Sequence, residues 1–370
     1  MHGFGCFDTI TSLGDTHGMR PAIANINIEN LRHNYRLLSK RAQTAKIMAV
    51  VKANAYGHGL DLISPALFDE GCRDFAVTDA REGKQLRELL PEAESIVLLS
   101  GLFDTEDAAL TCSQHLTPTI TNNHQLELLH SAGFGGSLWI KVNTGMQRLG
   151  ADYPAQLIEQ CRADNITVAG IMSHLACADT PEHPLNRAQA DEFSSLCQQL
   201  DPKLPASLLN SAGLVALPDE IHDFIRPGLA LYGAEPVADE PLGVRPVMQL
   251  VGQVMHVRDI DKGVSLSYGA SFTAHHDMKV AVVSTGYADG LPRILSNSGF
   301  AHARNATFPI VGRICMDYCL IDCTTLPLEL DDMVEFWGDN LAASTVSDLA
   351  STIPYELFTG VGSRVCRRVI

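Results

Sequence analysis

The sequence lacks the features that would direct it to a membrane, to nucleic acid or out of the cell. No apolar run in its 370 residues approaches the ~20 residues that a transmembrane helix needs. Its 27 basic residues are outnumbered by 43 acidic ones, so the net charge of −16 argues against nucleic acid or an anionic membrane as the main partner. Met1–Gly18 has neither a positively charged segment nor an apolar core, so we do not expect a secretory signal there.

The cysteines lack the spacing of a disulfide or metal framework. None of the ten forms a Cys-x-x-Cys pair, and without a secretory signal they are predicted to be reduced thiols of a cytoplasmic protein. Cys315, Cys319 and Cys323 recur every fourth residue on a predicted strand and would share one face. Three thiols along a strand lie too far apart for one tetrahedral ion, so we assign them to the core and predict no metal.

What the sequence does contain is an alternation of short apolar runs and helical patterns. No Gly-x-Gly-x-x-Gly fingerprint follows the first run, which disfavours the runner-up fold, an open doubly wound sheet. Eight strand–helix units in roughly 210 residues match a (β/α)8 TIM-type barrel, an α/β fold. The predicted strands are Ile47–Val51, Phe75–Val77, Ile96–Leu99, Leu116–Ile120, Leu138–Val142, Val168–Met172, Ala206–Leu209 and Phe224–Ile225.

Past about Pro241 the pattern changes to short β-rich segments separated by turns, with helical patterning only near Val346–Leu349. We therefore predict a barrel over residues 20–240 and a mostly β C-terminal domain over 241–370. Residues 1–19 are predicted to be a loose extension or the product of an upstream start codon. The strands predicted for the second domain are Val247–Val257, Val280–Ser284, Phe308–Val311, Cys315–Ile321 and Met333–Trp337.

Polar residues gather where the predicted barrel strands end, which is where barrels carry their chemistry. Lys52 ends the first strand, where burial would lower the pKa of the amine and make it a nucleophile able to form a Schiff base. Ser211, Gly228 and Leu229 follow the last two strands and offer the hydroxyl and N–H groups that hold a phosphate. With the flat ring of His174 between them, this set favours pyridoxal phosphate. Each feature alone is more typical of a turn or a structural side chain, so the prediction depends on their convergence.

The stretch Ala49–Gly59 resembles the pyridoxal-phosphate attachment motif of alanine racemases. The resemblance continues, in order, from about Arg20 to the C-terminal residue. The further matching motifs are Lys141–Gly150, Arg226–Gly233, Ser267–Gly269, Gly286–Arg293 and Cys315–Asp317.

The resemblance implies two catalytic bases on opposite faces of the substrate. Lys52 would hold the cofactor and act as one base, and Tyr268 from a partner subunit would be the other. A tyrosine base needs nearby cations that favour its phenolate, and His174 and Arg226 are the family's candidates. Arg226 would face the pyridine nitrogen, and as a permanent donor it would leave that nitrogen unprotonated.

The other matching residues would contact cofactor or substrate. Among them Arg148 would bond the phenolic oxygen of the cofactor, Tyr287 would stand at the entrance, and the partner subunit would contribute the substrate-side pair. The implied cofactor contacts are Lys52, Tyr56, Arg148, His174, Ser211, Arg226, Gly228, Leu229 and Tyr355. The implied substrate contacts are Arg148, Met316, Asp317 and Tyr287.

One buried lysine and two departures from the family pattern bear on the chemistry of the site. Lys141 lies within an apolar strand, where an ammonium is costly; in many members the matching lysine is carbamylated, and we expect the same modification here. Asn143 stands where many relatives have Asp. Ser207 stands where some have His behind the pyridine-facing arginine, which would shorten the hydrogen-bond relay supporting Arg226 and Tyr268.

The prediction is therefore a cytoplasmic, homodimeric, pyridoxal-phosphate-dependent alanine racemase that supplies D-alanine, which in bacteria feeds peptidoglycan. A broad-specificity or serine racemase is the nearest alternative. A decarboxylase of basic amino acids with the same fold is less favoured, because those relatives typically place an acidic residue at the pyridine nitrogen. A non-catalytic cofactor-binding protein, typically a lone barrel, would not need the second domain.

Overall fold

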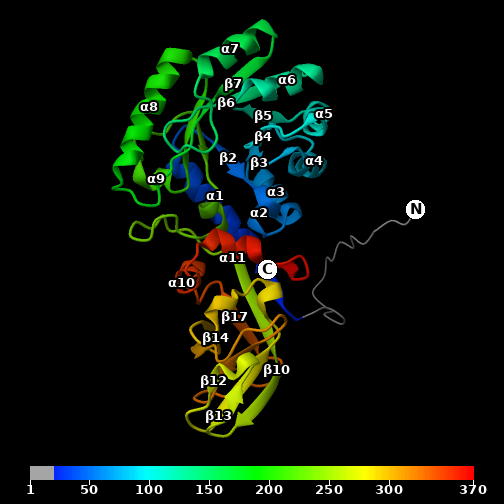
Figure 1. Ribbon diagram of the computed structural model, residues 1–370, viewed down its shortest axis with the longest axis vertical. Coiled ribbons are helices and arrows are strands. Elements are labelled where there is room, and N and C mark those ends of the chain that lie inside the picture. The colour runs from blue at the N-terminus through cyan, green and yellow to red at the C-terminus, as the bar shows by residue number, and fades with distance from the viewer. Residues whose placement is uncertain (1–20) are drawn as a thin grey trace, which may run out of the picture.

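The computed structural model describes residues 21–370, which form a helix-surrounded barrel above an elongated β domain (Figure 1). The expectation for residues 1–19 falls outside the described residues. Within them, no helix is both long and apolar enough to cross a bilayer, and all nine cysteines are free thiols.

Eight parallel strands close into the predicted barrel, in the order β2 to β9, which excludes the open sheet. Their apolar runs are buried on both faces, as parallel barrel strands require. The strands are β2 (Lys46–Val50), β3 (Asp74–Val77), β4 (Ser95–Leu98), β5 (Thr117–Ile120), β6 (Ser137–Lys141), β7 (Thr167–Met172), β8 (Ala206–Asn210) and β9 (Phe224–Arg226). The helices of this part are α1 (Ile28–Arg41), α2 (Lys52–Tyr56), α3 (Leu60–Asp69), α4 (Ala80–Leu89), α5 (Thr105–Ser113), α6 (Asn123–Ser131), α7 (Pro154–Ala163), α8 (Pro184–Leu200), α9 (Gly213–Ala216) and the 3-10 turn η1 (Leu229–Tyr232).

The second domain is built on the long strand β10 (Met248–Ile260), which pairs with three other strands of its sheet. Its remaining strands are β11 (Ser265–Leu266), β12 (Phe272–Thr273), β13 (Met278–Val283), β14 (Phe300–Ala303), β15 (Ala306–Pro309), β16 (Cys319–Asp322), β17 (Met333–Trp337) and β18 (Cys366–Val369). Its short 3-10 helices are η2 (Tyr268–Ala270), η3 (Tyr287–Asp289) and η4 (Arg293–Leu295). The predicted strand from Cys315 was too long: β16 starts at Cys319 because residues 312–318 are bends and irregular chain, so the three cysteines do not share a strand face.

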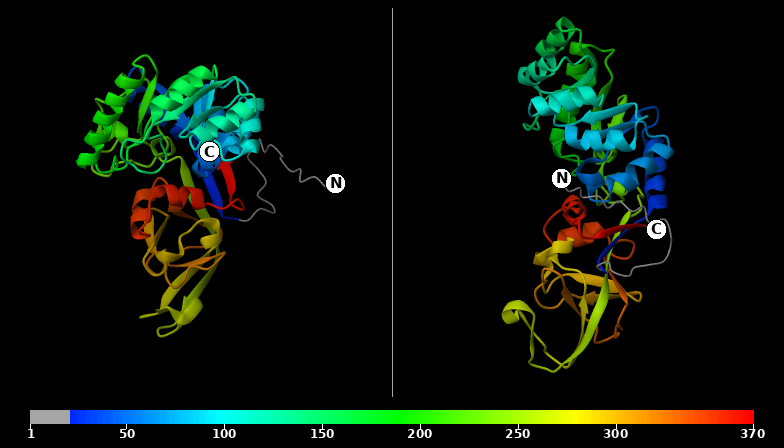
Figure 2. Two further views of the ribbon diagram at one scale, coloured as in Figure 1. Left: turned by 45° about the horizontal axis from the view of Figure 1, so that its top comes forward. Right: turned by 90° about the vertical axis from the view of Figure 1, so that its right-hand side faces the viewer.

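The two ends of the described chain meet in this sheet. Strand β1 (Ile23–Ile26) precedes the barrel in sequence, yet it pairs antiparallel with β10 and parallel with β18. Two helices follow β17, α10 (Ala343–Leu349) and α11 (Pro354–Gly360), and α11 lies at the junction of sheet and barrel in both views of Figure 2. The C-terminal part of the chain is thereby brought against the barrel.

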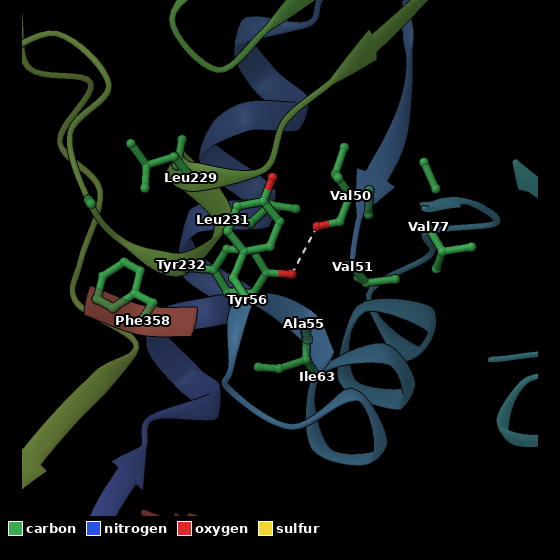
Figure 3. Packing of buried hydrophobic residues seen from close by; sticks show 14 of the residues in the cluster. Val50, Val51, Ala55, Tyr56, Ile63, Val77, Leu229, Leu231, Tyr232 and Phe358 are labelled. Atoms are coloured by element: carbon green, nitrogen blue, oxygen red, sulfur yellow. Dashed lines mark hydrogen bonds between the residues drawn. The ribbon is translucent and has the colours of Figure 1, made fainter. Parts of the chain in front are cut away.

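The loop after β2 has a left-handed backbone. Ala53, Asn54, Ala55 and Tyr56 all have φ between 52° and 55°, and Gly57 follows at 76°. Left-handed geometry costs roughly 1–2 kcal/mol per L-residue, so packing must hold it in place. Tyr56 is stacked on Tyr232 (Figure 3), and the ring centroids are 4.7 Å apart. The Tyr232 hydroxyl donates to the Val50 carbonyl at 2.9 Å. We call residues 52–59 the attachment loop.

Candidate active site

A cavity of about 590 Å³ opens at the C-terminal ends of the barrel strands, where sequence analysis placed the chemistry. Its size falls within the usual range for small-molecule sites. Ten of the predicted site residues line it together: Lys52, Tyr56, Lys141, Arg148, His174, Ser211, Arg226, Gly228, Leu229 and Tyr355.

Among the described residues, the lining of the cavity includes several cations and no acidic residue. Burial, followed by the field of Arg148, lowers the pKa of Lys52, and burial with the neighbouring cations lowers the pKa of Lys141 to about 8. A larger fraction of both amines is therefore neutral near pH 7 than in water. A cavity lined by several cations and by amines of lowered pKa is suited to an anionic carbonyl ligand.

The attachment loop is fixed from α4 by Glu82. This carboxylate accepts hydrogen bonds from the backbone N–H of Ala53, at 2.7 Å, and of Thr78, at 2.8 Å. It also raises the pKa of Lys52, against the larger effect of burial. Glu82 was not predicted from the sequence, although Asp79-x-x-Glu82 is a recognisable helix start, and Asp79 does cap α4.

In the phosphate cup predicted after β8 and β9, the Gly228 N–H is already used within the cup and the Ser211 hydroxyl is the donor that stays available. Ser211 Oγ accepts from the N–H groups of Gly228, at 3.0 Å, and Ala230, at 3.2 Å. Both acceptor sites of this hydroxyl are then used, so its hydrogen is available to an anion. A Cβ at Gly228 would lie 2.5 Å from the hydroxyl of Tyr56, so only glycine lets that phenol approach.

Two tyrosines complete the cup as neutral donors. Burial raises the pKa of Tyr56 above its ordinary value, and it raises the pKa of Tyr355 on α11 to about 12. The two rings lie 5.7 Å apart between centroids. Near neutral pH both hydroxyls therefore remain protonated and can donate to a phosphate.

Arg226 is buried, and its hydrogen-bond acceptors among the described residues are all neutral. Its guanidinium donates to Ser207 Oγ at 2.5 Å, the Ser173 carbonyl at 2.5 Å and the Leu208 carbonyl at 3.2 Å. Burial lowers the pKa of Arg226 to about 10, so it stays a cation at neutral pH. Ser207 Oγ donates to the Phe224 carbonyl at 2.8 Å. The shortened hydrogen-bond relay expected from the sequence therefore ends on a backbone carbonyl.

His174 does not serve as the second cation near the site. Burial and then Arg226 lower its pKa well below the ordinary value. Arg226 Nη2 lies 3.4 Å from Nδ1 of the ring, which places the ring hydrogen on Nε2. Of the two cations proposed from the sequence to favour a tyrosinate, only Arg226 therefore stays charged near neutral pH.

Asn143 organises the loop that carries Arg148. Its Oδ1 accepts from the N–H groups of Gly145 and Gln147, both at 3.2 Å. Its Nδ2 donates to Gln147 Oε1 at 2.8 Å and to Asp152 Oδ1 at 3.2 Å. Aspartate could not make the last two bonds and would face Asp152 with a like charge, which gives a local reason for the amide in this chain.

The three residues predicted to act from a partner subunit and the predicted entrance tyrosine lie in the β domain and do not line the cavity of their own chain. Tyr268, Tyr287 and Met316 are exposed, and Tyr268 is 70% exposed. Tyr268 follows Ser267, which has a φ of 59° and donates from Oγ to the Arg313 carbonyl at 2.6 Å. The Asp317 carboxylate is bonded by Arg364 at 2.8 Å. Their role in a second copy's cavity stays a prediction.

Comparisons with known proteins agree with this architecture. Family models described as the N-terminal and C-terminal domains of alanine racemase match residues 26–236 and 247–369. The alanine racemase of Stutzerimonas stutzeri is 37% identical, over 95% of this chain and 100% of its own.

Solved structures give the same result. The biosynthetic alanine racemase of Pseudomonas aeruginosa has a TM-score of 0.89 at 35% identity, covering 95% of this chain and all of its own. The alanine racemase of Bartonella henselae, solved with covalently bound pyridoxal phosphate, has a TM-score of 0.88 at 35% identity, with 95% and 99% coverage. Matched along both domains in sequence and in three dimensions, the chain belongs to the alanine racemase family.

Proposed function

We propose that this protein interconverts L- and D-alanine, with pyridoxal phosphate held on Lys52. The observation that carries the proposal is the cavity itself, in which an amine of lowered pKa, a phosphate cup and a buried arginine face one space that no acidic residue of the described part of the chain lines. Lys52 would hold the aldehyde, and Ser211, Tyr56 and Tyr355 would hold the phosphate. When bound, the cofactor supplies an electron sink that acidifies the Cα hydrogen of an attached amino acid.

Lys52 and Tyr268 act as the two acid/base groups. Lys52 reaches the cavity from the barrel, so its Nζ would take or return a proton on one face of Cα. The Tyr268 hydroxyl would do so on the opposite face from a second copy, because within one chain it lies outside the cavity. A homodimer in which each cavity receives Tyr268, Met316 and Asp317 from its neighbour therefore completes the site.

Arg226 favours a racemase over a decarboxylase of the same fold. The guanidinium has donors but no acceptor, and at a pKa of about 10 it does not act as a proton source near neutral pH. Facing the pyridine nitrogen, it would leave that nitrogen unprotonated and restrain the electron sink. This limits side reactions such as transamination, whereas an acidic residue at this place would strengthen the sink.

Lys141 is proposed to be carbamylated, as the resemblance implies. With a pKa of about 8, a useful fraction of its amine is neutral and can attack carbon dioxide; an N–C bond forms, and a proton is released to solvent. The resulting anion would partner Arg148, which lines the same cavity. Intact mass of freshly purified protein, with and without added bicarbonate, tests this, since absence of the added mass in bicarbonate contradicts it.

The reaction is tested with four substrates. Purified holoenzyme is incubated with L-alanine, L-serine, L-lysine and L-ornithine, and enantiomer composition and carbon dioxide are followed. Racemisation of alanine ahead of serine is expected, and carbon dioxide release without a D-enantiomer would overturn the proposal. In the cell we propose a cytoplasmic enzyme that supplies D-alanine for peptidoglycan.

A further inference from the structure

Three arginines in or just before β18 point to different parts of the molecule. Arg364 precedes the strand, and Arg367 and Arg368 lie within it. Arg367 bonds the attachment loop, Arg364 bonds two loops of the β domain, and Arg368 donates to Asn25 Oδ1 on β1 at 3.0 Å. The segment thus offers two functional contacts and one built-in control.

Arg367 links the attachment loop to the segment that follows α11 by hydrogen bonds. Its Nε donates to the Gly57 carbonyl at 3.0 Å, and its Nη2 donates to the Val361 carbonyl at 2.6 Å. Gly57 follows Tyr56 directly, and a Cβ at Gly57 would lie 2.1 Å from the Phe358 carbonyl of α11. One guanidinium therefore joins the loop carrying Lys52 and Tyr56 to the helix carrying Tyr355.

Arg364 joins the two substrate-side loops. Its Nε donates to the fully buried Asp289 at 2.8 Å, while Nη1 donates to Asp317 at 2.8 Å and Nη2 to the Met316 carbonyl at 3.1 Å. The other carboxylate oxygen of Asp289 accepts from the Gly286 N–H at 2.9 Å.

The same two loops are also paired through their backbones. The N–H groups of Tyr287 and Ala288 donate to the carbonyls of Cys315 and Met316, at 3.0 Å and 3.1 Å. A Cβ at Gly286 would lie 2.4 Å from each of those carbonyl oxygens, so only glycine permits this approach. The loops of Tyr287 and of Met316-Asp317 thus form one unit fastened by Arg364.

We propose that Arg364 and Arg367 are separate positioning residues, Arg364 for the substrate-side loops and Arg367 for the cofactor-binding loop. The inference rests on the proposed function. In the shared-site dimer, the substrate-side loops serve the neighbouring cavity while the attachment loop serves its own. One short segment of each chain would then organise half of two different active sites.

Arginine is needed at both positions because each guanidinium donates in several directions at once. Lysine has a compact ammonium that keeps the charge but cannot span carbonyls on two segments in a fixed plane. Arg364→Lys retains a cation beside the buried Asp289 yet cannot keep all three contacts. Arg367→Lys retains the charge but cannot hold Gly57 and Val361 together.

The experiment compares R364K, R367K and the matched control R368K. Pyridoxal phosphate affinity is measured on each apoprotein by fluorescence titration, KM for alanine is measured at saturating cofactor, and amide exchange is followed at Tyr287 and Ala288. R367K is expected to weaken cofactor binding about tenfold with KM within about twofold of wild type, since hydrogen bonds from a charged group are lost. R364K should raise KM several-fold and speed exchange, with cofactor affinity unchanged, and R368K should change none of these.

Folding is checked separately by thermal unfolding. Should either variant unfold, R367Q and the pair D289N/R364Q take their place, because they remove the charges without leaving an unpaired buried ion. Equal effects of R364K and R367K on both cofactor affinity and KM, or an R368K effect of similar size, would overturn the proposal. If wild-type protein does not racemise alanine, the proposed function fails, while cofactor affinity and amide exchange still decide the two positioning roles.

Discussion

At the scale of single residues, Tyr268 and Lys52 differ most in their surroundings. Lys52 lies in a cationic cavity, whereas Tyr268 is exposed on a turn of the other domain. The proposed second base does not line the cavity of its own chain, so its removal is expected to leave cofactor binding unchanged. Substitution at Tyr268 therefore separates binding from proton transfer.

Tyr268→Phe is expected to bind cofactor normally and to lose about 10²–10⁴-fold of its racemisation rate, since one acid/base group is missing. Cofactor absorbance and initial rates in both directions measure the two effects. Tyr153→Phe, at an equally exposed tyrosine on the barrel, serves as the control. Turnover like that of wild type in both directions would remove Tyr268 from the mechanism.

Ser207 tests how far Arg226 depends on its hydroxyl partner. Ser207→Ala removes the 2.5 Å bond and leaves only carbonyl acceptors and His174 around the buried guanidinium. We expect a loss of about 1.5–3 kcal/mol in the free energy of unfolding, the usual value for a hydrogen bond to a charged group. Urea unfolding measures it, and a loss below that of the exposed Ser195→Ala would contradict the assignment.

At the scale of elements, the attachment loop depends on one buried imidazole. His58 Nδ1 donates to the carbonyls of Ala55 at 3.1 Å and Tyr56 at 2.9 Å, and its ring packs between Tyr232 and Phe358. Nε2 has no partner among the described residues. Burial lowers the pKa of His58 to about 4, so the folded loop requires the neutral ring.

This makes the protein sensitive to acid in a defined window. Above the unfolded-state pKa of about 6.5 both states hold His58 neutral, and its contribution is complete; as pH falls toward 4 the unfolded state binds the proton first, so stability declines. The loss approaches about 3 kcal/mol by pH 4. The free energy of unfolding should fall more between pH 7 and pH 5 in wild type than in His58→Asn. The control His130→Asn should show the same fall as wild type. An unchanged difference in His58→Asn would exclude the imidazole as the source.

The cup formed by η1 and the attachment loop has its own steric test. Gly228→Ala would place a methyl group against the Tyr56 hydroxyl and should weaken cofactor binding about tenfold, because that phenol must move. Gly135→Ala, where a Cβ meets nothing within 4 Å, is the control. Equal cofactor affinity in the two variants would show that cofactor binding does not depend on the present position of the Tyr56 hydroxyl.

Elements also show what the sequence could reveal. All eight barrel strands were predictable because buried parallel strands are continuous apolar runs. Strands β1 and β18 were missed because their partners lie hundreds of residues away, and α11 because its apolar face is a single turn. The candidate residues predicted at strand ends line one cavity, whereas Glu82, Arg364 and Arg367 look like ordinary surface charges in the sequence, because only the fold brings them to a loop.

At the scale of the whole molecule, one chain has half of the proposed machinery on each domain. A shared dimeric site predicts complementation between two inactive variants. Mixing Lys52→Ala with Tyr268→Phe under subunit exchange should restore up to about a quarter of wild-type activity, since half the dimers are mixed and each has one intact site. Both sites of a mixed dimer would be defective if the bases came from one chain, so no recovery would contradict sharing.

The pairing of β1 with β18 also determines the order in which parts of the protein can fold during translation. The barrel strands are complete once Arg226 leaves the ribosome. The hydrogen bond from Arg367 to Gly57 can form only after the segment between Arg226 and Arg367 has been translated, which takes on the order of ten seconds. Until then β1 has no parallel neighbour, and the left-handed attachment loop lacks its hydrogen bond from Arg367. Nascent chains halted before Val361 should therefore contain a compact barrel that captures cofactor poorly, so that loading follows release rather than accompanying elongation.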